Sequence, residues 1–351
     1  MGEFGELERY SRQILFAPVG LDGQKKLRAA SVLVVGCGAL GTSVLEQLAR
    51  AGVGRIRFVD RDFVELSNLQ RQSLYTERDA AERLPKAVAT HRALAAINSE
   101  PEYDARVADC NHTNAEALAD GMDLILDGTD NFETRFLVNE VAVKRSLPYV
   151  YGACLGSTGT CMPILPGMTP CLQCVIPQPP DRATLPTCDT VGILAPAVRL
   201  VAAMEVAYAF RFLVEGPESI APALIQLDCW APEFLRVDMA EARQPDCPVC
   251  GHHQYRFLSG AEATQAVSLC GRNTVQIHFV SAGPGGAAPK VDFARLGERL
   301  ARLGPTRWNE YLLTFSAPPY ELVLFPDGRC LVKGTDDPAV AKSVYSQYIG
   351  M

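Results

Sequence analysis

Two pairs of cysteines have the spacing of a metal site. Cys171 and Cys174 form one CxxC pair, Cys247 and Cys250 form another, and 72 residues separate the pairs. Two thiolates three positions apart on a turn can bind one metal ion at roughly 2.3 Å, and two such pairs complete a closed tetrahedral site. Four soft ligands with no open position predict one structural zinc ion that joins two distant segments. A CxxC redox pair and a set of reduced structural thiols are the alternatives.

A glycine-rich turn predicts a second site, for nucleotide phosphates. Gly36, Gly38 and Gly41 form a GxGxxG pattern directly after the apolar run 31–35. Such a turn lets phosphates approach the backbone, while the following helix supplies unpaired N–H groups and the positive end of its dipole. Asp60 ends the next expected strand, where a carboxylate can accept hydrogen bonds from ribose hydroxyls. Taken alone, the pattern favours NAD or FAD, and a purely structural glycine turn is the alternative.

Three further clusters change that interpretation. The segment SNLQRQ supplies Asn68 and Arg71, and Lys86 lies near the start of the next expected helix. Thr129 and Asp130 follow a later strand, at the sheet edge where ligands bind. A dehydrogenase has little need for two extra cations and an acid beside its pyrophosphate. A nucleotidyl-transfer site needs them, because arginine and lysine offset the triphosphate charge and an aspartate can hold magnesium. Asp130 also suits a helix N-cap, and both roles can hold together.

Alternating strands and helices position these residues. Buried strands are expected at 31–35, 55–60, 103–108, 124–127 and 148–151, and helices at 42–52, 81–98, 115–120 and 133–145. This order predicts a Rossmann-like, doubly wound α/β domain with a mostly parallel sheet. Residues 152–180 have the composition of short strands and a long loop, and an apolar helix is expected at 194–215. The zinc ion would pin this crossover region to the end of the domain, which is expected to span residues 1–255.

A small C-terminal α+β domain, of unknown role, is expected at residues 260–351. Its predicted strands lie at 274–280, near 311–325 and at 330–333, and its predicted helices lie at 293–303 and from 337 onward. Segment 281–289 is rich in glycine and is expected to be a mobile loop.

Composition excludes several classes of protein. The 351 residues carry a formal charge of -7, which argues against a bulk electrostatic nucleic-acid binder. The polar N-terminus has no apolar h-region, and the most apolar stretch, 192–210, contains Arg199 and Glu205, so neither a secretory signal nor a membrane span is expected. We therefore expect a cytoplasmic protein without a nucleic-acid or membrane partner. In that compartment, twelve cysteines favour metal ligation or thiol chemistry over disulfides.

Five motifs stand in order over roughly residues 7–250: RYSRQI from Arg9, the glycine turn, AGVG at 51–54, SNLQRQ, and TDN at 129–131. Together they resemble the ThiF/MoeB/HesA family, relatives of ubiquitin-activating enzymes. The resemblance implies ATP- and magnesium-dependent adenylylation of the C-terminal glycine carboxylate of a ubiquitin-like sulfur-carrier protein ending in Gly-Gly, with release of pyrophosphate. A ThiS-like carrier, for thiazole synthesis, is preferred. A MoeB-like enzyme of molybdopterin synthesis, or one serving both carriers, is the alternative.

The same resemblance implies roles for individual residues of the nucleotide site. Asp60 would hold the ribose, and the glycine turn with Asn68, Arg71 and Lys86 would hold the triphosphate. Asp130 would coordinate magnesium and be the most important catalytic acid. The resemblance also supports a zinc ion on the four paired cysteines.

Two further residues gain roles from the resemblance. Arg12 would reach into the ATP site of a neighbouring subunit, which implies a homodimer; an exposed N-terminal charge is the alternative. Cys188 precedes an expected helix, where a thiol can have a lowered pKa, and would form a persulfide-derived or thioester link to the carrier. A buried, inert thiol is the alternative. Neither Cys270 nor Cys330 lies in a convincing rhodanese loop, so a separate sulfur donor such as a cysteine desulfurase is a further expected partner.

Two interpretations from other classes remain. A nicotinamide or flavin oxidoreductase would show a bound chromophore or NAD affinity, and it leaves Arg71, Lys86 and Asp130 unexplained. A non-catalytic binding module of the same fold would be expected to lack one of these three residues, yet all are present.

Overall fold

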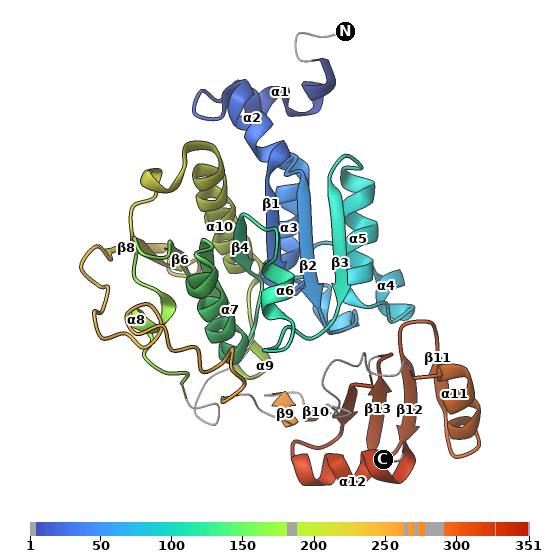
Figure 1. Ribbon diagram of the computed structural model, residues 1–351. Helices are drawn as coiled ribbons and strands as arrows, with labels where there is room; N and C mark the ends of the chain where they lie inside the picture. The colour runs from blue at the N-terminus through green and yellow to red at the C-terminus, as the bar shows by residue number, and fades with distance from the viewer. Residues whose placement is uncertain are drawn as a thin grey trace. The chain divides into compact units, whose positions relative to one another are not determined.

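The computed structural model describes residues 5–180, 188–262, 266–269, 273–277, 291–326 and 328–349 (Figure 1). The expected glycine-rich loop at 281–289 lies outside the described residues. The described residues form two compact units. The first contains those up to 180 and those from 192 to 262, and the second contains 188–191 and those from 266 onward.

An eight-stranded sheet forms the centre of the first unit, in the order β3-β2-β1-β4-β5-β6-β7-β8. Its first five strands in this order pair in parallel: β3 (Glu102–Val107), β2 (Arg55–Asp60), β1 (Ser31–Val35), β4 (Leu124–Asp127) and β5 (Tyr149–Leu155). The remaining three extend the sheet in antiparallel fashion: β6 (Thr158–Ile164), β7 (Ala223–Asp228) and β8 (Glu233–Asp238). The predicted Rossmann-like, mostly parallel α/β architecture is confirmed.

Helices cover the two faces of this sheet (Figure 1). On one side α3 (Ala39–Ala51) packs against α5 (Lys86–Ile97) and α10 (Ala195–Glu215), and on the other α6 (Ala115–Ala119) packs against α7 (Phe132–Arg145). β1 and β4 are buried along nearly their whole length, as their continuous apolar runs predict for strands covered on both faces.

One predicted helix starts later than expected. Of the helix expected at 81–98, the structure has α5 from Lys86 to Ile97, and a turn separates it from a short preceding helix, α4 (Glu77–Ala81). Pro85 occupies the N-cap position of α5, and Arg83 in the turn has a φ of 49°. A proline disfavours helical conformation in the residue before it, so the helix starts only at Lys86.

The chain enters the sheet through short helices that the sequence patterns did not predict, α1 (Ser11–Ile14) and α2 (Gly20–Ala29). The side-chain amides of Gln13 and Gln24 both donate to the Ala51 carbonyl, at 3.2 and 2.9 Å. These bonds tie α1 and α2 to the C-terminal end of α3.

The second unit has its own six-stranded sheet, in the order β11-β12-β13-β14-β10-β9, and its described pairs are all antiparallel. The strands are β9 (Ala266–Leu269), β10 (Thr274–Ile277), β11 (Thr306–Trp308), β12 (Leu313–Ala317), β13 (Tyr320–Leu324) and β14 (Cys330–Lys333), and the helices are α9 (Cys188–Val191), α11 (Phe293–Ala301) and α12 (Pro338–Tyr348). A separate apolar core includes Phe315, Leu324 and Val344. Within the described ranges of both units, no helix has the length and apolar character needed to cross a membrane.

Candidate functional site

The three glycines of the turn after β1 do different things. Gly36 has a φ of 99°, which L side chains rarely adopt, so it makes the turn. A Cβ atom on Gly41 would lie 1.9 Å from the Gly36 carbonyl oxygen, and one on Gly128 would lie 2.4 Å from it. The turns after β1 and β4 are therefore packed backbone against backbone. A Cβ on Gly38 would meet only the Gly128 oxygen, at 3.8 Å, so this part of the turn is open to a ligand.

Asp60 fixes the turn from the end of β2. Its Oδ2 accepts a hydrogen bond from the Cys37 amide at 2.7 Å, and its Oδ1 accepts one from the Asp62 amide at 2.7 Å. Burial is the main cause that raises the pKa of Asp60, and Asp62 raises it further, while Lys86 lowers it. A carboxylate has about four lone-pair sites, so these two bonds leave Asp60 capacity for ribose hydroxyls.

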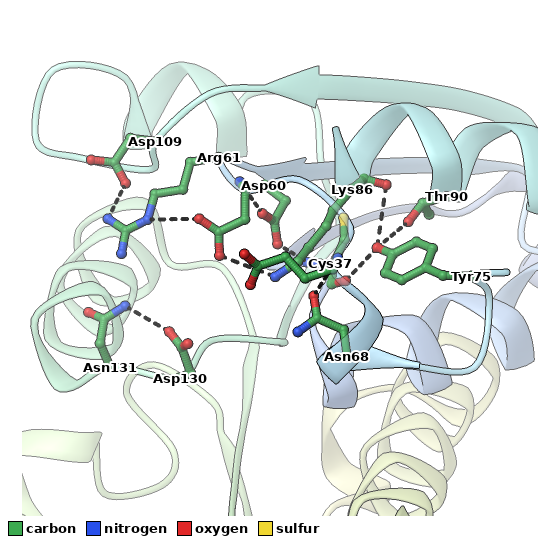
Figure 2. A network of polar contacts seen from close by, with 12 residues as sticks. Cys37, Asp60, Arg61, Asn68, Tyr75, Lys86, Thr90, Asp109, Asp130 and Asn131 are labelled. Carbon is green, nitrogen blue, oxygen red and sulfur yellow. Dashed lines mark hydrogen bonds and ion pairs between the residues drawn. The ribbon is translucent and has the colours of Figure 1, made fainter. Parts of the chain in front are cut away.

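A chain of ion pairs starts from Lys86 at the first turn of α5. The side chain is 4% exposed, and its Nζ lies 3.1 Å from Asp62 Oδ2. The other oxygen of Asp62 lies 4.0 Å from Arg61 Nε, and Arg61 Nη1 lies 2.9 Å from Asp109 Oδ1. In Figure 2, Asp109 lies above the Arg61 guanidinium at one end of this arrangement, and Lys86 lies at the other end. Asp62 was not predicted from the sequence, although its position two residues after Asp60 was a usable signal.

The SNLQRQ segment places Asn68 and Arg71 differently. Asn68 is buried, and its Oδ1 accepts from the Glu65 amide at 3.2 Å in a capping box at the start of a short 3-10 turn. Arg71 is partly exposed, and its Nη1 donates to the Ser67 carbonyl at 2.9 Å. Asn68 therefore shapes the segment, and Arg71 supplies a cation near its surface.

Tyr75 joins this segment to the glycine turn, which sequence reasoning did not predict. Its hydroxyl donates to the Cys37 carbonyl at 2.6 Å and shares a hydrogen bond with Thr90 Oγ1 at 3.0 Å (Figure 2). Burial holds the pKa of Tyr75 well above its usual range, so the hydroxyl stays protonated and able to donate. No local pattern marks Tyr75, because its partners lie in the glycine turn after β1 and on α5.

A buried carboxylate supports the turn after β4. Asp127 Oδ1 accepts from the Thr129 amide at 2.8 Å and from the Thr129 hydroxyl at 2.7 Å. Its Oδ2 accepts from the Tyr149 hydroxyl at 2.5 Å and lies 3.6 Å from Arg135 Nε. Arg135 in turn donates to the Thr129 carbonyl at 3.0 Å. The predicted ligand-binding side chain of Thr129 thus points into this network and orients the residue that follows it.

Asp130 is exposed at the end of that turn. The N-cap interpretation of Asp130 was wrong: α7 starts at Phe132, so Asn131 is the N-cap, and its side chain accepts from the Thr134 amide at 2.9 Å. Asn131 also donates to Asp130 Oδ1 at 3.4 Å. In Figure 2, Asp130 lies across from the Arg61 guanidinium, at the same edge of the sheet as Lys86.

Arg12 lies elsewhere in this chain. It is exposed on α1, and the preceding Tyr10 packs its ring where a Cβ of Gly52, the C-cap of α3, would be. The 13 residues of α3 separate this point from the glycine turn, a distance of about 20 Å at 1.5 Å per residue. Cys188 is the first residue of α9, but its side chain lies outside what the structure describes.

The four paired cysteines come together in the first unit. Their sulfur atoms all lie within 4.8 Å of one another, with separations of 3.9 Å for Cys171–Cys174, 3.6 Å for Cys171–Cys247 and 3.4 Å for Cys174–Cys250. A tetrahedral zinc ion with bonds of about 2.3 Å requires sulfur separations of roughly 3.8 Å. The donor set and its dimensions therefore fit a closed zinc site.

Helix α7 anchors both cysteine segments. Asn139 Oδ1 accepts from the Leu172 amide at 2.9 Å, inside the first CxxC pair. Glu140 Oε2 accepts from the Leu258 amide at 2.8 Å, shortly after the second pair. The segments are thus held close to each other by neighbouring residues of one helix.

Known proteins are similar to this chain in sequence and in fold. The ThiF family profile matches residues 10–249. Over 343 residues the chain is 44% identical to the sulfur carrier protein ThiS adenylyltransferase of Bacillus subtilis, covering 97% of this chain and 99% of that protein. It is 39% identical to the sulfur carrier protein adenylyltransferase of Thermus thermophilus, covering 70% and 91%. The fold is similar to that of E. coli MccB crystallised with AMPCPP and MccA, with a TM-score of 0.62, 26% identity, and coverage of 70% and 74%.

Proposed function

The chain belongs to the ThiF family, and we propose that it is an adenylyltransferase that activates the C-terminal glycine carboxylate of a ubiquitin-like sulfur-carrier protein with ATP. The main support for this proposal is that three features lie together at the carboxyl ends of β1 and β4. These are an open glycine turn at Gly38, a buried ammonium at Lys86, and an exposed carboxylate at Asp130. Ligands of doubly wound sheets bind at this switch point.

The proposed reaction needs the carrier carboxylate aligned with the α-phosphorus of ATP and the phosphate charge stabilised. A carrier carboxylate oxygen forms a bond to the α-phosphorus of ATP, the bond from that phosphorus to the bridging oxygen breaks, and pyrophosphate leaves. No proton has to move in this step, so the site needs no general base. The glycine turn and the α3 N-terminus receive phosphate oxygens, and Lys86 and Arg71 offset their charge.

Magnesium is proposed as the metal of this site, with Asp130 as its protein ligand, because an exposed carboxylate beside phosphate oxygens suits a hard cation. When bound, magnesium neutralises triphosphate charge. Asp127 contributes by fixing the Gly128–Thr129 backbone, and it thereby sets the position of Asp130.

The carrier is proposed to be of the ThiS type. The relative that aligns with 97% of the chain bears the name of a ThiS adenylyltransferase, whereas the Thermus thermophilus relative aligns with 70% of the chain. A MoaD-type carrier, or both carriers, remains the alternative, since the same ATP-site chemistry serves either.

Carrier-dependent ATP–pyrophosphate exchange tests the proposal, with purified ThiS-type and MoaD-type carriers offered in parallel. Exchange with the ThiS-type carrier that disappears in Asp130→Ala is the expected result. Asp123→Ala is the matched control, because Asp123 is an exposed carboxylate just before β4, at the opposite end of the strand from Asp130. Absence of exchange with both carriers, in protein that binds ATP, would contradict the proposed reaction.

A structural zinc ion on Cys171, Cys174, Cys247 and Cys250 is part of the proposal. Closed four-sulfur sites have no open position for substrate, so this ion would hold the crossover region to the end of the first unit. The anchoring of both segments by α7 supports this role.

A homodimer with Arg12 in the neighbouring ATP site is also proposed. Arg12 is exposed and is followed by Leu15 and Phe16, each 62% exposed, as expected for a surface that a partner covers. Light scattering of wild type and Arg12→Ala, combined with the exchange assay, tests it. A dimeric Arg12→Ala protein with lost exchange supports the role, and unchanged exchange contradicts it.

Cys188 is proposed to link covalently to the carrier after adenylylation: its thiolate attacks the acyl carbon of the carrier adenylate, the bond from that carbon to the phosphate oxygen breaks, and AMP leaves as a thioester forms. Sulfur is proposed to come from a separate donor such as a cysteine desulfurase. Adenylylation itself does not need this thiol. Cys188→Ala should therefore retain pyrophosphate exchange and lose sulfur transfer to the carrier. Loss of exchange in a folded variant would contradict this division of roles.

A further inference from the structure

Three side chains that follow the carboxyl ends of β2 and β3 form, together with the proposed phosphate-binding lysine on α5, a series of alternating charge. In order they are Asp109, Arg61, Asp62 and Lys86. Figure 2 labels Asp109, Arg61 and Lys86. The β2–β3 ladder continues to the bond from the Ala108 amide to the Asp60 carbonyl, at 3.2 Å, so Arg61 and Asp109 lie just beyond the paired strands. A rigid ladder therefore sets the spacing of this arrangement.

The Asp62 carboxylate lies between two cations. Lys86 Nζ is 3.1 Å from one oxygen, and Arg61 Nε is 4.0 Å from the other. Lys86 therefore makes the closer contact with Asp62, and Arg61 is the more distant of its two cations. Arg61 is itself held from the far side by the 2.9 Å pair with Asp109. Burial alone would lower the pKa of the Arg61 guanidinium, but Asp109, Asp62 and Asp130 together raise it above its usual value.

ATP binding requires the ion pair between Lys86 and Asp62 to open. If Lys86 is to offset triphosphate charge, its ammonium must turn at least partly away from Asp62. A largely buried Asp62 carboxylate would then lose its closest counter-ion beside an incoming anion, which is costly in a region of low dielectric constant. Arg61, which already lies near the other oxygen of Asp62, removes the cost of leaving this carboxylate without a counter-ion.

We propose that Arg61 is a positioning residue for ATP binding, which takes over the charge of Asp62 when Lys86 turns to the triphosphate. The inference rests on the proposed function, because it assumes that Lys86 contacts ATP phosphates. Asp109 keeps the guanidinium in place during the exchange. Without Arg61, Asp62 would retain Lys86 and its charge would repel the phosphates.

Nucleotide affinities measured by competition against a fluorescent ATP analogue, with magnesium present, test the proposal. R61Q should raise the Kd for ATP about tenfold, the size of one charge-assisted hydrogen bond. The Kd for adenosine, which has no phosphate for Lys86 to contact, should change less than about twofold. R61K keeps the charge and should bind ATP within about threefold of wild type.

Removing Asp62 gives the sharper readout. In the double variant R61Q/D62N the carboxylate that lies 3.1 Å from Lys86 Nζ is removed, so ATP affinity should return to within about threefold of wild type. D62N alone should bind ATP at least as tightly as wild type. A merely structural Arg61 would not be rescued by loss of a second charge.

Arg55 offers a matched control. It links the same two strands from their other end, with its Nε 3.2 Å from Glu102 Oε1 and its Nη2 3.7 Å from Asp104 Oδ2. R55Q should leave the Kd for ATP unchanged, whatever it does to the melting temperature.

Three results would each overturn the inference: R61Q binding ATP as wild type does, R61Q/D62N remaining as weak as R61Q, or D62N binding ATP more weakly than wild type. An equal loss in R55Q would show that the effect comes from the strands and not from Lys86. Failure of the proposed function looks different, because the wild-type protein itself would then bind no ATP.

Discussion

Gly38 and Gly41 stand three residues apart in one turn, yet the structure predicts opposite consequences for replacing them by alanine. The Cβ of Gly41→Ala would lie 1.9 Å from the Gly36 carbonyl oxygen, where ordinary contact begins at 3.4 Å, so a backbone must move by about 1.5 Å. No rotamer change relieves this clash, because both sides are backbone. Overpacking of this kind costs about 1–3 kcal/mol, against at most ~1 kcal/mol gained from better helix propensity within α3.

Gly38→Ala meets no such obstacle. Gly38 is the N-cap of α3 with a φ of -80°, which alanine adopts readily, and its Cβ would meet one oxygen at 3.8 Å. The loss of a good N-cap residue costs roughly 0.5 kcal/mol. The new methyl group would instead stand where a phosphate must approach the backbone, so the loss should fall on ATP binding.

Thermal melting and ATP titration of both variants distinguish these effects. Gly41→Ala should lower the melting temperature by about 3–8 °C, from a net loss of roughly 1–2 kcal/mol. Gly38→Ala should melt within about 2 °C of wild type and bind ATP at least ~10-fold more weakly. Equal melting of the two variants would refute the backbone-packing argument. Normal ATP affinity in Gly38→Ala would refute the assignment of this turn to phosphates.

Three further outcomes are expected. Wild-type protein should keep one equivalent of zinc per chain after mild chelation, and Cys250→Ser should keep less and melt at a lower temperature. Cys229→Ser, which lies outside the cluster, should change neither the zinc content nor the melting temperature. Full zinc retention by Cys250→Ser would contradict the site. Asp127→Asn should cost about 3 kcal/mol in urea unfolding, because it leaves the buried Arg135 without its carboxylate; a loss below ~1 kcal/mol contradicts this. Glu205 is fully buried, and this burial, followed by the charge of Asp127, holds the pKa of Glu205 well above its usual range. Its contribution to stability is therefore full below the unfolded-chain pKa of ~4.3. This contribution is lost as pH rises toward the folded pKa, by about 1.4 kcal/mol per pH unit. Glu205→Gln lacks this loss, so its melting temperature relative to wild type should increase between pH 6 and pH 8.5; a pH-independent difference contradicts the buried, protonated state.

Several features were predictable because their signals are local. The strands β1 and β4 are short apolar runs, and their predicted bounds, 31–35 and 124–127, agree with the structure. The glycine spacing predicted the turn before α3, and Asp60 ends β2 as expected. Each of these depends on the conformation of a few consecutive residues, which side-chain type and spacing largely determine. Helix ends were less exact: α7 starts at Phe132, and its N-cap is Asn131 and not Asp130.

The chemical groups of this protein could be identified from its sequence: a phosphate-type turn, a set of cations and carboxylates, and four thiols whose two CxxC pairs predicted a shared site. Most of the other contacts of the site could be found only in the folded chain. Tyr75 reaches Cys37 across 38 positions, and Arg61 reaches Asp109 across 48. Such contacts depend on strand order and helix packing, which are set by the burial of apolar surface over the whole domain and leave no periodic signal near the residues themselves.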